Sequence, residues 1–122
     1  MRNKMTAVKL AVLSLGMVAA GAHADFLQAG KIVAGSDVTF APYEYMKNDK
    51  PAGFDIEMLS GVAKAMGRQL VTLDTRFPNL IPGLKGKKFD VTNSAMYITP
   101  ERLKVVDMIP YLKTGQSIVV LA

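Results

Sequence analysis

The alternation of short apolar runs with helix-like segments constrains the fold of this chain more than any other feature. Four runs are predicted as strands, at residues 31–36 (KIVAGS), 69–75 (QLVTLDT), 89–93 (FDVTN) and 117–122 (SIVVLA). Each is short and largely apolar, as expected of strands in a buried sheet. Helical segments separate them along the chain. This order predicts an α/β fold in which a mostly parallel sheet is flanked by helices.

The predicted helices are marked by spacing and by their ends. Within residues 55–66 the apolar side chains recur at helical intervals, and Gly67 is placed to end the helix. A short helix is predicted over residues 79–87, interrupted or opened by Pro82. Residues 51–53 (PAG) are predicted as a turn.

A third helix is predicted to begin at Pro100. Thr99 precedes it, and a threonine hydroxyl can accept a hydrogen bond from the free amides of a first helical turn. Proline loses nothing at the first helical position, because its missing N–H would have no partner there.

The first 24 residues have the organisation of a secretory signal. Three basic residues, Arg2, Lys4 and Lys9, accompany the apolar run LAVLSLGMVAAGA, which ends in the small-residue sequence AHA. This run is too short for a retained membrane span. We therefore expect cleavage after Ala24, a mature domain over residues 25–122, and a periplasmic location.

Removal of this segment changes what the composition implies. The whole chain has 15 basic and 10 acidic residues, and loss of three basic residues leaves a net charge of +2. This balance gives no support for nucleic-acid binding. The chain has no cysteine, and its one histidine, His23, leaves with the signal. We therefore expect no disulfide, no metal site and no cofactor.

Ligands of parallel α/β sheets bind beyond the carboxyl ends of the strands. Two loops at such ends contain unusual residues: residues 37–43, after the first predicted strand, and residues 93–102, after the third. Phe77 lies in a third loop of the same kind. These loops are the predicted ligand site.

Five motifs carry a resemblance to a known family. They are GSDVTFAPYEY, GFDIEMLSGVAKAMG, NLIPGLKGKKFDV, MYITPERLKVVDMIPY and TGQSIVV. In this order and spacing, the chain resembles the periplasmic solute-binding proteins of family 3, which deliver polar amino acids to ABC transporters. The resemblance implies a small-molecule ligand, an amino acid or a related compound, and a membrane permease as partner.

The resemblance also implies roles for seven residues. Arg102 matches the arginine that forms a bidentate hydrogen bond to the α-carboxylate of the ligand, a geometry that suits a planar guanidinium. Phe40 and Phe77 match the pair that encloses the ligand side chain. The other matched positions are Asp37, which meets a polar or cationic ligand side chain in several relatives, Ser94 and Ala95, which offer backbone groups, and Tyr97.

Alternatives remain for several of these residues. Arg102 could be a surface charge, Phe40 and Phe77 could be core residues, and Asp37 could hold local amides in a turn. Two positions depart from the family pattern. Ala95 stands where glycine or serine is frequent, and Tyr97 stands where a small hydroxyl residue usually receives the ligand α-amine.

The family normally has two lobes, and this chain ends near the first crossing between them. We therefore expect residues 25–122 to be a partial N-terminal lobe, with residues 117–122 as the strand that enters the hinge. A lone lobe supplies only half of the polar contacts, so we expect millimolar or undetectable affinity for amino acids.

Two other functions share this fold. The chain could be the extracytoplasmic sensor domain of a receptor, or a periplasmic dehydratase. We expect no catalytic residues and no enzyme activity, because no histidine, cysteine or plausible carboxylate pair accompanies Arg102. Glu44 and Asp37 are the acidic residues that could be proposed for such a pair.

Overall fold

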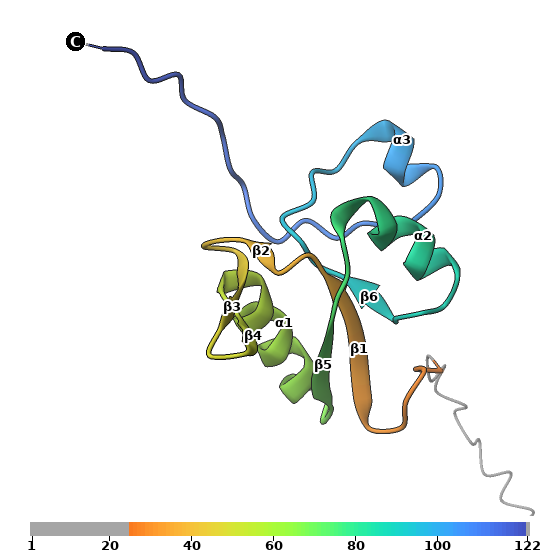
Figure 1. Cartoon of the computed structure of the whole chain (residues 1–122). Helices are drawn as coiled ribbons and strands as arrows, with labels where there is room; N and C mark the ends of the chain where they lie inside the picture. Colours follow the sequence, from red (N-terminus) through yellow and green to blue (C-terminus); the bar gives the residue numbers. More distant parts are fainter. Residues whose placement is uncertain (1–24, 122) are drawn as a thin grey trace, which may run out of the picture.

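A computed structural model describes residues 25–121 of the chain. Its centre is a parallel three-stranded sheet in the order β5-β1-β6, made by β1 (Lys31–Ser36), β5 (Gln69–Asp74) and β6 (Val91–Thr92) (Figure 1). The predicted α/β fold with a mostly parallel sheet is confirmed. The proposed signal segment, residues 1–24, lies outside the described residues.

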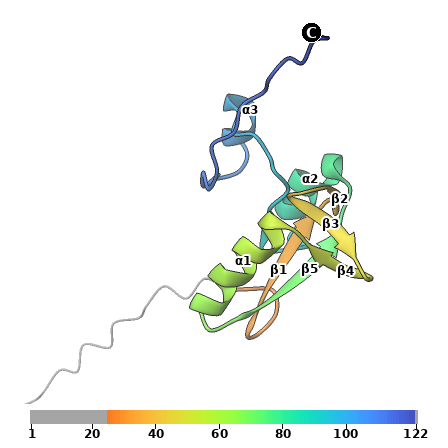
Figure 2. The ribbon, with the colours of Figure 1, turned by 90° about the vertical axis from the view of Figure 1, so that its left-hand side faces the viewer.

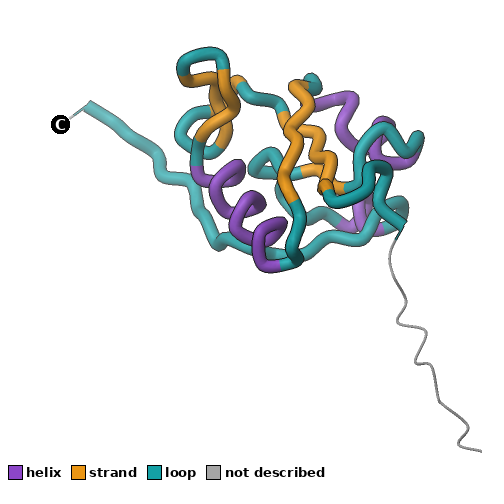
Figure 3. The backbone as a smooth tube through the Cα atoms, turned by 90° about the horizontal axis from the view of Figure 1, so that it is seen from below, coloured by secondary structure: helices purple, strands orange, loops and turns teal. Residues whose placement is uncertain are grey.

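The sheet is built from two crossover connections. Helix α1 (Phe54–Ala65) joins β1 to β5, and the 3-10 turn η1 (Phe77–Asn79) with helix α2 (Leu80–Lys85) joins β5 to β6. Right-handed crossovers that run in opposite directions from one sheet place their helices on opposite faces. Figure 3 shows α1 and α2 to either side of the strands.

Helix α1 forms where the apolar spacing predicts it. Its buried side chains include Ile56, Leu59 and Ala63, and the helix packs on β5. Gly67 follows its last turn with a φ of +67°, a left-handed conformation that glycine adopts without strain. The N–H of Gly67 donates to the carbonyl of Lys64.

The core between α2 and the sheet is centred on Phe89. Its ring packs with Val33 and Leu80, and all three residues are buried. The ring also lies against two glycines, Gly35 of β1 and Gly83 of α2. A Cβ atom at Gly35 would meet the ring Cζ at 2.5 Å, and one at Gly83 would meet it at 2.6 Å. Glycine at these positions makes room for the ring.

A second, antiparallel sheet includes residues of the predicted loop 37–43 and of the predicted turn 51–53. It is formed by β2 (Thr39–Phe40), β3 (Glu44–Lys47) and β4 (Lys50–Ala52). The predicted turn at residues 51–53 is wrong, since β4 occupies most of it. The actual turn is Asn48–Asp49, with φ of 49° and 59°. Two consecutive residues with positive φ match the twist of a tight hairpin, and Asn and Asp tolerate this conformation.

The end of the described chain also differs from the prediction. Residues 117–121 form no strand, and Ile118 is 93% exposed. The β-branched residues favour a strand only where a neighbouring strand can pair with them, and the described residues provide none for this segment. The predicted strand at residues 89–93 is confirmed but shorter, as β6.

The third helix is confirmed. Helix α3 (Pro100–Leu103) begins after Thr99, whose Oγ1 accepts from the N–H of Arg102 at 3.3 Å. Figure 2 shows α3 and the segment after it at the end of the molecule toward which the parallel strands point. Among the described residues, no helix is long and apolar enough to cross a membrane.

Candidate ligand-binding site

The loops at the carboxyl ends of the three parallel strands meet at Asp37. Its Oδ2 accepts from the N–H of Phe77 at 2.8 Å, and its own N–H donates to Ser94 Oγ at 3.1 Å. Its Oδ1 accepts from Thr39 Oγ1 at 2.7 Å. The hydrogen bond from Thr39 lowers the pKa of Asp37, with help from the Phe77 N–H and the positive charge of Arg76. The Asp37 carboxylate therefore joins the loop after β1 to the loop after β5, through one local hydroxyl and one amide that is distant in the sequence.

Arg102 and Phe77, which are predicted site residues from different loops, lie next to each other. The guanidinium carbon of Arg102 is 5.6 Å from the centroid of the Phe77 ring. Nη1 of Arg102 donates to the carbonyl of Tyr97 at 2.6 Å. A guanidinium has five N–H donors, so this bond fixes the group and leaves further donors for an anion.

Both predicted aromatic residues are accessible to solvent. Phe40 is 55% exposed and stacks on Tyr43, with ring centroids 5.6 Å apart and an angle of 22° between the planes. Phe77 is also exposed. Neither residue belongs to the core formed by the described residues.

A cleft of about 500 Å³ opens beside the Phe40–Tyr43 stack. Of the predicted site residues, Phe40, Ala95 and Tyr97 line it, together with Tyr43 and Tyr111. Asp37, Phe77, Ser94 and Arg102 are not among its lining residues. Tyr43 and Tyr111 were missed, although both stand in the quoted motifs, in PYEY and MIPY.

A buried polar cluster lies behind the ligand loop, by which we mean residues 93–97. Ser94 Oγ donates to Glu44 Oε1 at 2.8 Å, and the N–H of Ala95 donates to Asp55 Oδ2 at 2.8 Å. The hydroxyl of Tyr111 donates to the same Asp55 oxygen at 2.7 Å. The side chain of Ser94 and the amide of Ala95 are thus engaged within the protein, and Ala95 adopts a φ of +43°.

The two carboxyl groups of this cluster were not anticipated as a pair. Glu44 is 1% exposed and Asp55 is 0% exposed. Burial raises the pKa of Glu44 to about 7, the hydrogen bond from Ser94 opposes this shift, and the charge of Asp55 adds to it. Burial, followed by the hydrogen bond to Asp55, raises the pKa of Tyr111.

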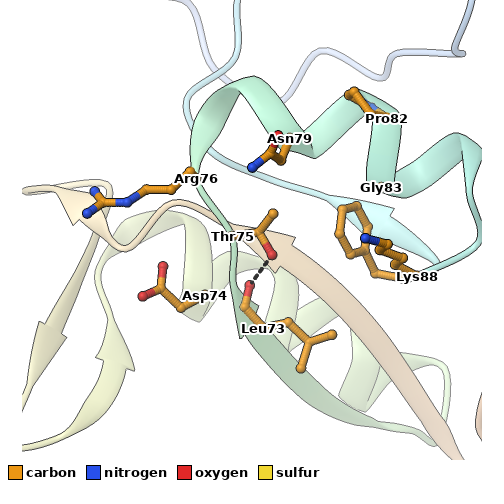
Figure 4. A pocket seen from close by; sticks show the side chains of 9 residues that line it. Leu73, Asp74, Thr75, Arg76, Asn79, Pro82, Gly83 and Lys88 are labelled. Atoms are coloured by element: carbon orange, nitrogen blue, oxygen red, sulfur yellow. Dashed lines mark hydrogen bonds between the residues drawn. The ribbon is translucent and has the colours of Figure 1, made fainter.

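A second hollow, of about 550 Å³, lies between the end of β5 and α2 (Figure 4). Arg76, Asn79 and Lys88 are among its lining residues, and Thr75 Oγ1 donates to the carbonyl of Leu73 at 3.2 Å. It contains none of the predicted site residues. In the part of the chain that the structure describes, no group of three or more His, Cys, Asp or Glu side chains could hold a metal ion.

The model of a family described as bacterial extracellular solute-binding proteins, family 3, matches residues 32–122. The chain belongs to this family. The arginine-binding extracellular protein ArtP of Bacillus subtilis is 30% identical over 122 residues, an alignment that covers 98% of this chain and 48% of the relative. The chain spans less than half the length of the curated relatives it matches.

A solved structure and an enzyme extend this comparison. The arginine-bound form of domain 1 of TmArgBP, from T. maritima, is 38% identical, with a TM-score of 0.59, and the match covers 62% of this chain and 60% of that chain. A cyclohexadienyl dehydratase of Pseudomonas aeruginosa is 30% identical over 93 residues, which are 75% of this chain and 35% of the enzyme. Family membership supports a substrate-binding role, and one relative performs catalysis.

Proposed function

We propose that this chain is part of the first lobe of a periplasmic substrate-binding protein for a cationic amino acid, with arginine as the leading candidate. In this proposal residues 1–24 direct export, residues 25–122 form part of the N-terminal lobe, and the loaded protein delivers its ligand to the membrane permease of an ABC transporter. The family and the arginine-binding relatives support it.

The observation that carries the proposal is the position of the Arg102 guanidinium. It is fixed by the Tyr97 carbonyl and lies over the Phe77 ring, at the end of the sheet where α/β folds bind ligands. Its remaining N–H groups can form two parallel bonds to an α-carboxylate.

The aromatic residues suit a cationic ligand side chain. A guanidinium or ammonium group is attracted to the face of an aromatic ring, and the attraction is larger where water is excluded. Phe40 and Phe77 are accessible, and Tyr43 extends the Phe40 surface by stacking. We propose that these rings enclose the ligand side chain and that Tyr97, in the same cleft as Phe40, limits its size.

Asp37, Ser94 and Ala95 have a supporting role in this proposal. Their hydrogen bonds join the loops that carry Phe77 and Tyr97, so they shape the site through the backbone. Asp37 can still contribute its negative charge to a cationic ligand.

One neighbour is relevant to the expectation of millimolar or undetectable affinity for a lone lobe, which stays a prediction. Domain 1 of TmArgBP, a single domain, has an arginine-bound form. One lobe of this family can therefore hold arginine, and we propose that this chain binds L-arginine measurably in the same way.

Calorimetry with L-arginine tests the proposal, with ligand-observed NMR where binding is weak. Arg102→Lys should lower the affinity by roughly 10- to 150-fold, the worth of a hydrogen bond to a charged group. Arg68→Lys is the matched control, because Arg68 lies over the Phe26 ring at 3.9 Å and directly before β5, at the opposite end of the strands. Equal affinity in all three proteins would remove Arg102 from the site.

A dehydratase activity is the second candidate, and one observation favours it. Glu44 and Asp55 form a carboxyl pair of the kind that can donate and accept protons. Both are sealed from solvent, however, so a substrate could reach them only if the ligand loop moved. Loss of water from a hydroxylated cyclohexadiene creates an aromatic ring, and ultraviolet absorption would detect such turnover. We expect none.

A further inference from the structure

Two buried carboxyl groups lie behind the ligand loop, and in the described part of the chain each has one oxygen without a hydrogen-bond partner. Glu44 comes from β3 and Asp55 from the first turn of α1. Glu44 Oε1 accepts from Ser94, and Asp55 Oδ2 accepts from Ala95 and Tyr111. Within residues 25–121, Glu44 Oε2 and Asp55 Oδ1 are buried and have no hydrogen-bond partner.

Two buried carboxyl oxygens without hydrogen-bond donors raise the free energy of the folded protein when both carboxyl groups are ionised. An unpaired buried polar atom loses its hydration without compensation, and two neighbouring carboxylates repel each other strongly in a medium of low dielectric constant. The two residues are neighbours, because the N–H of Asp55 donates to the carbonyl of Tyr43, next to Glu44, at 2.8 Å, and their carboxyl groups bond to the adjacent residues Ser94 and Ala95. One proton between them would satisfy both free oxygens and remove the repulsion in a single step.

Among residues 25–121, none of the groups that bond to the pair or shift the pKa of Glu44 carries a positive charge that could replace that proton. Asp37, after β1, adds a further negative charge. Tyr111, from the segment after α3, contributes a neutral hydroxyl, and the ligand loop contributes the hydroxyl of Ser94 and the amide of Ala95. The Nδ2 group of Asn93 donates to the Asp55 carbonyl, outside the carboxyl pair.

We propose that Glu44 and Asp55 share a single proton, held between Glu44 Oε2 and Asp55 Oδ1, and that this proton positions the ligand loop. Glu44 is the protonated partner and donates, and Asp55 stays ionised and accepts. The charge of Asp55 then strengthens its bonds from the Ala95 amide and the Tyr111 hydroxyl, which attach the ligand loop and the segment after α3 to the domain.

Release of the proton should loosen these attachments. With both carboxyls ionised, the pair gains stability by admitting water, and the bonds from Ser94 and Ala95 open with it. Glu44 and Asp55 are positioning residues, because they act on a ligand only through the loop. The effect on ligand binding rests on the proposed function, whereas the shared proton does not.

Carbon-13 NMR of the side-chain carboxyls of the protein tests the proton directly. We expect the Glu44 carboxyl to release its proton well above the range of an ordinary glutamate. Replacement of Asp55 by asparagine should return Glu44 to a lower midpoint, because the negative neighbour is gone. A Glu44 carboxyl that titrates in the ordinary range of a glutamate in the unmodified protein would overturn the proposal, as would a bound cation between two ionised carboxyls.

Hydrogen exchange at the Ala95 amide tests the positioning. The protection factor of this amide, which corrects for the intrinsic exchange rate, should fall by up to about tenfold per pH unit. The fall should begin at the pH at which Glu44 would ionise in an unfolded chain. Glu44→Gln supplies a permanent N–H donor in place of the proton, so its protection should be nearly independent of pH. Glu57→Gln is the matched control and should behave as the unmodified protein. A Glu44→Gln protein as pH-dependent as the control would disprove the positioning role.

Calorimetry with L-arginine at several pH values extends the test to the ligand. The affinity should fall at high pH in the unmodified protein and in Glu57→Gln, and stay level in Glu44→Gln. Absence of arginine binding at every pH would reject the proposed function alone, because the NMR and exchange measurements need no ligand. Binding with the same pH profile in all three proteins would instead reject the link between the proton and the ligand loop.

Discussion

The carboxylate of Asp37 accepts a hydrogen bond from the backbone N–H of Phe77, 40 residues further along the chain, at 2.8 Å. This bond fixes the loop after β5 against the loop after β1. The predicted site therefore depends on an aspartate whose oxygens are directed at the protein itself.

Replacement of Asp37 by alanine should destabilise the protein and disorder the approach of Phe77 to Arg102. Loss of the bonds from Thr39 and Phe77 to a charged acceptor should cost about 1–3 kcal/mol of unfolding free energy. Asp107→Ala, at an exposed position, is the control and should change little. Urea denaturation measures both, and an unfolding free energy equal to that of the control would show that these bonds are weak.

The same carboxylate gives a stability contribution with a known dependence on pH. Its pKa in the folded protein is lowered from the ordinary 3.8. Its contribution is therefore present above that value and is lost as the pH falls through the lower, folded-state pKa. In the Asp37→Ala protein, this acid-induced loss should be smaller.

Glu44 should give the opposite dependence. Its pKa rises from 4.5 to about 7 on folding, so the folded state holds more protons between these values. The contribution is complete below 4.5 and is lost as the pH rises through about 7. We expect the melting temperature to decrease over this interval and the decrease to be smaller in Glu44→Gln. Parallel melting curves for Glu44→Gln and Glu57→Gln would contradict this expectation.

Much of the scaffold could be predicted because its signals are local. The apolar spacing identified α1, and the Thr99–Pro100 pair identified the start of α3 within a few neighbouring residues. The hairpin at Asn48–Asp49 was missed because the nearby Pro-Ala-Gly sequence is the stronger turn signal. The strand expected at residues 117–122 was wrong over its described part, because its sequence preference has no neighbouring strand to act on.

The sequence could indicate which loops to consider as the site, but not how their side chains contact one another. The motifs directed attention to the loops of Phe77, Tyr97 and Arg102, whose role in binding stays a prediction, but no spacing rule indicated that Glu44 and Asp55 would meet. Their contact depends on the hairpin and α1 packing side by side, which is a tertiary relationship. Ser94 and Asp37 likewise form hydrogen bonds to residues that are distant in the sequence, and these contacts also depend on tertiary structure.

Gly35→Ala should destabilise the protein by about 1–3 kcal/mol, because the new methyl group would displace the Phe89 ring in a filled core. Gly61→Ala is the matched control: it lies in α1 with no atom within 4 Å of a new Cβ, and should stabilise the protein by roughly 0.5–1 kcal/mol. Thermal unfolding distinguishes the two. If Phe89→Leu failed to relieve the effect of Gly35→Ala, the ring would not be its cause.

Tyr97→Ser should change the order of preference among amino acids more than it changes stability. The side chain of Tyr97 is exposed and lines the cleft, and its carbonyl, which holds Arg102, is kept in every substitution. Tyr97→Phe retains the bulk and removes the hydroxyl, so it separates the two contributions. Calorimetry with arginine, histidine and glutamine provides the ranking. A large fall in melting temperature with an unchanged ranking would show that Tyr97 serves packing.

The contact of the Phe89 ring with Gly35 and Gly83 limits the substitutions that these three positions can accept during evolution. Neither glycine can acquire a side chain while the phenylalanine remains, and a smaller residue at 89 would leave an empty space that the glycines cannot fill. Substitutions at residues 35, 83 and 89 are therefore coupled. We expect their substitutions in related sequences to occur together, with smaller residues at 89 accompanied by larger ones at 35 or 83.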